Sequence, residues 1–178
     1  NLLYLVNDVL DFSKIEAGQL QLHYQDCRLS SVICDVIRGH ATLAHSKGLK
    51  VALEWAIEVP DLARIDAVRV GQVLSNLLNN AVKFTEHGTV TLDMQPVPAQ
   101  EGRLGLAVEV RDTGIGMEPE ELNHIFDFFY RADPSRSLES GGVGLGLSMV
   151  KMIAEAHNGS VTVTSTPGQG STFTFSLP

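Results

Sequence analysis

Apolar residues recur along this chain at two spacings, one typical of helices and the other of strands. Between residues 66 and 85 they recur every three or four positions, which predicts a helix with one apolar face. The same spacing predicts helices over 30–48 and 147–157, and a short helix beginning near Glu118. Residues 1–17 are apolar on more than one side, so this opening helix is expected to need neighbours outside the main core.

The expected helix ends are marked by capping residues. Ser30 is the predicted N-cap of the second helix, because its side-chain oxygen can accept a hydrogen bond from a free backbone N–H group. Gly18 is expected to end the opening helix, and Asn158-Gly159 the last one.

Alternating apolar and polar residues predict strands between these helices. The predicted strands cover residues 20–24, 50–55, 89–94, 104–112, 160–165 and 171–177. Residues 96–102 are expected to form a hairpin loop, and the polar segment 131–140 a mobile lid. Helices on one face of a mostly antiparallel sheet are the economical arrangement of these elements.

The length and composition of the chain are typical of a single soluble globular domain. It has 178 residues, 44% hydrophobic and 19% charged, with a net charge of −8 and dispersed basic residues, so no nucleic-acid surface is expected. Cys27 and Cys34 have neither zinc-ligand spacing nor a disulfide framework, which fits a reduced cytosol. No apolar run approaches membrane-spanning length and no signal pattern opens the chain, so we expect a cytoplasmic domain whose parent is anchored, if at all, through other segments.

A glycine-rich stretch leads into the last predicted helix. Gly142, Gly144 and Gly146 permit close approach of a ligand, and the free N–H groups at the start of a helix attract phosphate. The spacing matches neither the dinucleotide fingerprint nor the P-loop. Alone, it also fits a tight helix entry without a ligand.

Two further candidates lie upstream. Asn76, Asn80 and Lys83 stand at i, i+4 and i+7, so they share the face opposite the apolar stripe. An asparagine oxygen suits Mg²⁺ and a lysine suits phosphate, although a solvated helix face is the alternative. Asp112 ends a strand before two glycines, where a carboxylate could accept a hydrogen bond from the adenine amine; the same residues also suit an ordinary turn.

Taken together, four motifs resemble the N, G1, F and G2 boxes of sensor histidine kinases. They occupy residues 76–85, 112–116, 126–131 and 142–147, in the family's order. Residues 7–18 resemble the end of the second helix of that family's dimerisation and phosphotransfer hairpin, especially in hybrid kinases. The resemblance implies a Bergerat-type histidine kinase ATPase fold, an α/β (α+β) sandwich in which helices cover one face of a mixed, mostly antiparallel sheet.

The resemblance also implies the domain boundaries and the roles of the residues. Residues 1–18 would belong to the hairpin helix and 19–178 to a catalytic ATP-binding domain. Asn80 would ligate Mg²⁺, while Asn76 and Lys83 would lie at the phosphates and Asp112 would hold adenine. The implied catalytic set is Asn76, Asn80, Lys83 and Arg131. The implied ATP-binding set adds Phe84, Asp112, Gly114, Ile115, Gly116, Tyr130, Arg131, Gly142, Gly144, Leu145 and Gly146. Val143, where the family usually has Thr or Ser, and the apolar Phe128 depart from its pattern.

The implied activity is transfer of the ATP γ-phosphoryl group to a histidine, with later relay to a receiver aspartate and a homodimeric full-length protein. None of the six histidines is followed by Glu or Asp, as the family's acceptor usually is, so the acceptor is expected outside this chain. Two alternatives remain. A nucleotide-independent regulator would act by pairing with another kinase. An ATPase of the same fold is less favoured, because the hydrolytic relatives carry Glu where Asn76 stands and an amide cannot act as a general base.

Overall fold

The computed structural model describes residues 10, 13, 20–99, 104–131 and 143–178. Apart from Leu10 and Ser13, the predicted opening helix lies outside these residues. So do Gly142 and the predicted lid beyond Arg131.

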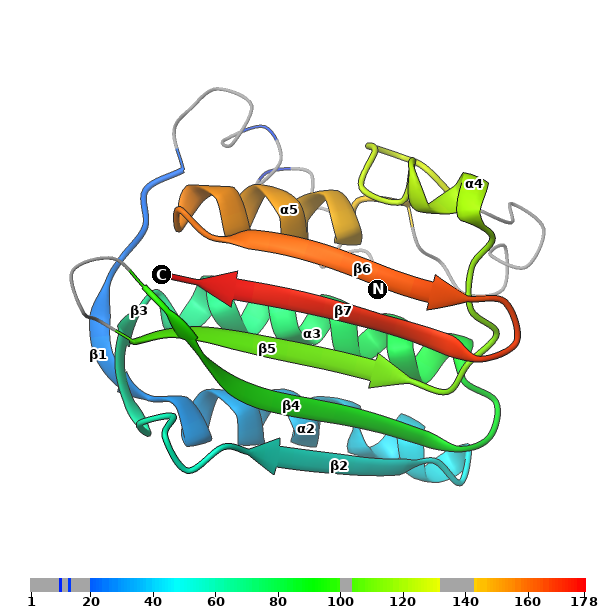
Figure 1. Ribbon diagram of the computed structural model, residues 1–178, viewed down its shortest axis with the longest axis horizontal. Coiled ribbons are helices and arrows are strands. Elements are labelled where there is room, and N and C mark those ends of the chain that lie inside the picture. Colours follow the sequence, from blue (N-terminus) through cyan, green and yellow to red (C-terminus); the bar gives the residue numbers. More distant parts are fainter. Residues whose placement is uncertain (1–9, 11–12, 14–19, 100–103, 132–142) are drawn as a thin grey trace.

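The described residues form one main sheet with helices on one of its faces (Figure 1). The five-stranded sheet has the order β2-β4-β5-β7-β6, and a separate two-stranded sheet pairs β1 with β3. The elements in chain order are β1 Gln25–Arg28, α2 Leu29–Ser46, β2 Lys50–Trp55, β3 Leu62–Ile65, α3 Ala67–Phe84, β4 Thr89–Pro98, β5 Leu104–Asp112, α4 Pro119–Leu122, α5 Gly146–Ala156, β6 Ser160–Thr166 and β7 Gly170–Leu177.

The sheet is mixed and mostly antiparallel. Only β2 and β4 are parallel within it, with Val51 opposite Val90, and the other three pairings are antiparallel. The parallel pair needs a long crossover, which β3 and α3 provide. The predicted fold class, a mostly antiparallel sheet covered by helices on one face, is confirmed.

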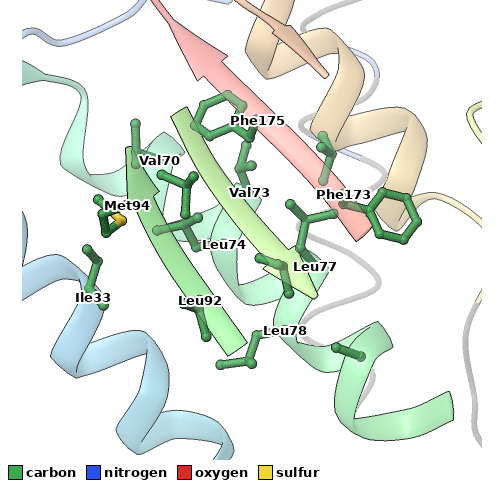
Figure 2. Packing of buried hydrophobic residues seen from close by; sticks show 14 of the residues in the cluster. Ile33, Val70, Val73, Leu74, Leu77, Leu78, Leu92, Met94, Phe173 and Phe175 are labelled. Atoms are coloured by element: carbon green, nitrogen blue, oxygen red, sulfur yellow. The ribbon is translucent and has the colours of Figure 1, made fainter. Parts of the chain in front are cut away.

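Helix α3 is the central helix of the covering layer. Its N-cap is Asp66, whose side chain accepts a hydrogen bond from the Arg69 N–H group at 3.0 Å. Its apolar stripe is buried against the sheet and the neighbouring helices, as Figure 2 shows for Val73, Leu77 and Leu78. The helix therefore forms because one face is apolar at helical period and its first turn is capped.

The core lies between α3 and the inward-facing residues of the strands (Figure 2). Leu92 and Met94 of β4 and Phe175 of β7 are fully buried there, and Ile33 contributes from α2. The outward residues of the same strands are polar, and no helix among the described residues covers the opposite face of the sheet (Figure 1).

Three local predictions are wrong. Residues 20–24 are not a strand, and the strand begins only at Gln25. The N-cap of α2 is Arg28 rather than Ser30, and the Ser30 N–H group donates instead to Asp61 Oδ1 at 2.9 Å. Residues 96–98 belong to β4 and not to a loop, since the pairing with β5 continues to Pro98. Strand β3 was not predicted at all.

Residues 20–24, which we call the linker, are held against the domain by two contacts. The His23 N–H group donates to Asp66 Oδ2 at 2.9 Å, so Asp66 caps α3 and binds the linker at once. The Tyr24 ring meets the buried His157 ring, at the end of α5, edge-on with centroids 5.6 Å apart. The linker thus contacts the N-cap residue of α3 and the C-cap residue of α5.

Within the described ranges, no helix has both the length and the apolar character needed to cross a membrane.

Leu78→Ala is expected to lower the free energy of unfolding by about 2–5 kcal/mol, because the Leu78 side chain is fully buried and its removal leaves a cavity. Urea denaturation of the chain measures this loss. Val68→Ala on the same helix is the control, since Val68 is 74% exposed and its change should stay within about 0.5 kcal/mol. Equal losses for the two variants would contradict the assigned burial.

Candidate functional site

The polar stripe of α3 faces the start of α5. The Asn76 Nδ2 atom donates to the Gly146 carbonyl oxygen at 3.3 Å, although the two residues are 70 positions apart. A side chain at Gly146 would point toward Asn76 at ordinary contact distance, 3.7 Å. The structure therefore brings one residue of the asparagine stripe and one of the glycine loop together.

Lys83, two turns after Asn76 on α3, and Arg131 are near enough for their positive charges to interact. Burial and the nearby Arg131 guanidinium both lower the pKa of Lys83. The Lys83 ammonium lies 4.8 Å from the centre of the Phe84 ring. The Arg131 Nη2 atom is buried, and among the described residues it has no hydrogen-bond partner. Two cations whose charges repel each other, one of them with an unpartnered donor, are suited to binding an anion.

Asn80, the predicted metal ligand, lies one turn from Asn76 on the same helix and is half-buried. Within the part of the chain that the structure describes, no hydrogen bond occupies its side chain. Its amide oxygen is therefore available to a ligand. The Asn76 amide, by contrast, already donates a hydrogen bond to Gly146.

Asp112 lies at the end of β5 in a partly buried position. Burial raises the pKa of its carboxyl group, and hydrogen bonds from the backbone N–H groups of Gly114 and Ser171 act in the opposite direction. The Gly114 N–H donates at 2.8 Å. A carboxylate held in this way keeps further lone pairs for a polar ligand.

Ser171 was not among the predicted site residues. It lies opposite Asp112 in the β5–β7 pairing, and its hydroxyl is 3.0 Å from that of Ser165. The Ser165 hydroxyl accepts a hydrogen bond from the Met117 N–H group at 2.9 Å, which fixes the end of the loop after Asp112. The register of two strands distant in sequence places these residues, so the local sequence carries no signal for them.

The loop after Asp112 packs closely on its surroundings. The Ile115 N–H group donates to the Phe84 carbonyl oxygen at 3.3 Å, which joins this loop to the end of α3. A side chain at Gly114 would meet that same carbonyl oxygen. Gly116 has a φ of +66° and abuts the Thr166 backbone, so glycine is required at that position by the fold itself.

Gly144 also has a structural reason to be glycine. Its φ is +81°, and a Cβ atom there would lie 2.8 Å from the Tyr130 carbonyl oxygen. The Phe129 N–H group donates to the Gly144 carbonyl oxygen at 3.1 Å. The structure thus brings Tyr130 to the glycine loop, while the buried Leu145 side chain belongs to the core and can offer a ligand only its backbone.

A family model described as "Histidine kinase-, DNA gyrase B-, and HSP90-like ATPase" matches residues 65–178. This range contains α3, the loop after Asp112 and the glycine loop. The chain belongs to this family of ATPase-fold proteins.

Its relatives include several sensor kinases. The chain is 38% identical to the signal transduction histidine-protein kinase BarA of Escherichia coli (strain K12), over 99% of this chain and 19% of that protein. It is 36% identical to the autoinducer 2 sensor kinase/phosphatase LuxQ of Vibrio cholerae, over 100% of this chain and 21% of that protein. The chain therefore spans about a fifth of the length of these curated relatives.

The structure of full-length ShkA in complex with AMPPNP is similar to this chain, with a TM-score of 0.84 and 33% identity over 99% of this chain and 35% of that one. The catalytic domain of the histidine kinase ThkA has the same fold, with a TM-score of 0.73 and 24% identity over 88% of this chain and 95% of that one. The resemblance to the catalytic ATP-binding domain of sensor histidine kinases is confirmed.

Proposed function

We propose that this chain binds ATP and transfers its γ-phosphoryl group to a histidine of another segment, as part of a two-component sensor kinase. The observation that carries the proposal is the cation pair. Burial and the nearby Arg131 guanidinium lower the pKa of Lys83, and the buried Arg131 Nη2 atom has no partner among the described residues. Asn76, on the same helix as Lys83, contacts the glycine loop at Gly146. An anionic polyphosphate would relieve both the mutual repulsion and the unpaired donor.

The proposed base site is the region around Asp112. Its carboxylate would accept a hydrogen bond from the adenine amine, while the Gly114 and Ser171 N–H groups hold it in place. Phe84, Ile115 and Gly116 would form the walls of this pocket, and Tyr130 would approach from the side of the predicted lid. The glycine-loop residues Gly142, Gly144, Leu145 and Gly146 would contribute backbone N–H groups to the phosphates.

Mg²⁺ fits the proposed site through Asn80. The half-buried Asn80 amide has no competing hydrogen bond in the described part of the chain, and an amide oxygen is a suitable hard ligand. Among the described residues, no three His, Cys, Asp or Glu side chains gather to hold a metal. In the proposal, phosphate oxygens and water would complete the coordination. When bound, the ion would offset phosphate charge.

The protein's task in the proposed reaction is positioning and charge neutralisation. The bond between the γ-phosphorus and the bridging oxygen of ADP breaks, and a bond from phosphorus to a histidine ring nitrogen forms. Lys83 and Arg131 would hold the phosphates, and Asn76 would orient them from α3. Asn76 cannot take a proton from water, so hydrolysis by the mechanism of the related ATPases is disfavoured.

The proposed parent protein is larger than this chain. We assign residues 1–18 to the second helix of a dimerisation and phosphotransfer hairpin and 19–178 to the catalytic domain. The acceptor histidine would lie on the other hairpin helix, in the same protein or its dimer mate, with a response-regulator receiver as the later acceptor. The domain would lie in the cytoplasm, with any membrane anchor in other segments of the parent.

Mixing this chain and Mg-ATP with a separate fragment that carries the first hairpin helix is expected to produce acid-labile phosphohistidine on the fragment. Radiolabelled γ-phosphate followed on gels before and after acid treatment measures the transfer. Lys83→Met should reduce the label strongly, because it removes one of the two phosphate-binding cations, whereas Lys151→Met on the exposed side of α5 is the matched control.

Acid-labile label on this chain alone would contradict the proposal. Tight nucleotide binding without label on the fragment would favour the alternative of a regulator that pairs with another kinase. Rapid release of inorganic phosphate would favour the related ATPase.

A further inference from the structure

Lys47 stands at the end of α2, in a position that its own turn holds firmly. The Gly48 N–H group donates to the His45 carbonyl oxygen at 2.9 Å, and the Leu49 N–H group to the Ala44 carbonyl oxygen at 3.0 Å. With Gly48 at a φ of +67°, this is a Schellman turn. Leu49 and Ala44 are both buried, so an apolar contact anchors the turn on either side of Lys47.

From this position the Lys47 ammonium binds the end of another helix, α3. Its Nζ atom donates to the carbonyl oxygens of Val82 and Lys83 at 2.8 Å each and to that of Thr85 at 3.2 Å. An ammonium group has three donors, and all three are used here. No carboxylate pairs with Lys47 among the described residues, so the backbone of α3 is its principal partner.

These contacts complete the hydrogen bonding of the helix end. A helix leaves its last carbonyl groups without partners from the helix itself. At the end of α3, Lys47 binds three of the carbonyl oxygens between 82 and 85, and the Ile115 N–H group binds the fourth, that of Phe84. Lys47 and the loop after Asp112 therefore cap the same helix end together.

We propose that Lys47 is a positioning residue for the nucleotide site and acts through this shared cap. The inference rests on the proposed nucleotide binding, because the groups it positions are Lys83 on α3 and Ile115 beside Asp112. Lys47 also acts on the site through its charge. The end of a helix carries partial negative charge, which repels a polyphosphate, and the Lys47 ammonium offsets that charge at the three carbonyls.

Lys47→Met tests this role, because methionine fills the space of the lysine stem without the ammonium group. Affinity for AMPPNP, measured by calorimetry, is expected to fall about tenfold. Hydrogen exchange at the Ile115 amide without nucleotide is expected to become faster, since Lys47 no longer holds the carbonyls on either side of the Phe84 carbonyl that Ile115 binds. Lys47→Arg keeps a charged donor in a different shape and should recover part of the affinity.

Asp66→Ala is the matched control at the opposite end of the same helix. It removes the N-cap that binds the Arg69 N–H group, so it destabilises α3 without touching the cap shared with Ile115. The expected result is loss of thermal stability with unchanged AMPPNP affinity and unchanged exchange at Ile115. If the two variants lose affinity in proportion to stability, Lys47 is only a structural residue.

The proposed function and this inference fail in different ways. Wild-type chain that does not bind AMPPNP would overturn the proposed function, and exchange at Ile115 would still decide whether Lys47 holds the loop. Wild-type binding with equal affinity in Lys47→Met would overturn the positioning role alone. If Lys47→Met does not fold, the comparison is made with Lys47→Gln, which lacks the charge, and unchanged affinity with unchanged Ile115 exchange in that variant would likewise overturn it.

Discussion

Asp112→Ala is expected to weaken binding of adenine nucleotides by about ten- to a hundredfold. A hydrogen bond to a charged group contributes roughly 1.5–3 kcal/mol, and the Asp112 carboxylate is the charged acceptor at the proposed base site. Calorimetric titration with AMPPNP measures the loss. Asp93→Ala is the control, because it also removes a largely buried carboxylate, but one paired with Arg111 on the open face of the sheet. Equal affinity of wild type and Asp112→Ala would remove the base-recognition role.

The same residue should give the binding a characteristic pH dependence. Adenine's amine needs the ionised carboxylate as acceptor, and burial raises the pKa of Asp112 above its ordinary value of 3.8. Nucleotide affinity is therefore present at neutral pH and is lost as the pH falls through this raised pKa. The loss occurs at a higher pH than it would for an aspartate with an ordinary pKa. Asp112→Asn has no carboxyl group to protonate, so its weaker binding should not show this loss of affinity at acidic pH. Parallel titrations of wild type and Asp112→Asn from neutral into acidic pH separate the two.

Asn80→Ala is expected to remove the contribution of Mg²⁺ to nucleotide binding and to abolish most phosphoryl transfer. Alanine has no side-chain oxygen, so the proposed metal site loses its protein ligand. In the presence of Mg²⁺ the affinity for AMPPNP should fall about tenfold or more, and in EDTA the variant and the wild type should bind equally weakly. Calorimetry under both conditions measures the difference.

Asn79→Ala provides a matched control for this prediction. It is the same change in the neighbouring residue of the same helix, but Asn79 is exposed and points from a different side of α3. Its affinity should equal that of the wild type with and without Mg²⁺. A defect of Asn80→Ala that persists unchanged in EDTA would exclude Asn80 as the metal ligand.

The parts of the fold that the sequence predicts well are those with long periodic patterns. Helix α3 begins after Asp66 as expected, because an apolar stripe and an N-cap residue act together. Strand β5 ends at Asp112 as expected, since its alternation is regular. The short β3 was missed because four residues carry too little pattern, and its pairing partner β1 is distant in sequence.

The candidate site likewise contains residues that a local pattern predicts and residues that only tertiary packing brings to it. Asn76, Asn80 and Lys83 could be grouped from their spacing on one helix, because helical geometry relates neighbouring turns directly. Ser171 and Lys47 could not be found in this way. The first reaches Asp112 through strand register, and the second reaches α3 across 35 to 38 positions of sequence. Contacts set by tertiary packing leave no local pattern.

The hydrogen bond between the His23 N–H group and Asp66 has a consequence for how far the catalytic domain can reach. From Gly18, where the predicted hairpin helix ends, to His23 an extended chain spans at most about 18 Å. If this bond, the contact of Tyr24 with His157 and the pairing of β1 with β3 all opened, the free chain would run from Gly18 to Leu29 and span at most about 40 Å. The Asp66 carboxylate, the Tyr24 ring and a four-residue strand together therefore halve the radius within which the proposed ATP site can search for an acceptor histidine on the hairpin.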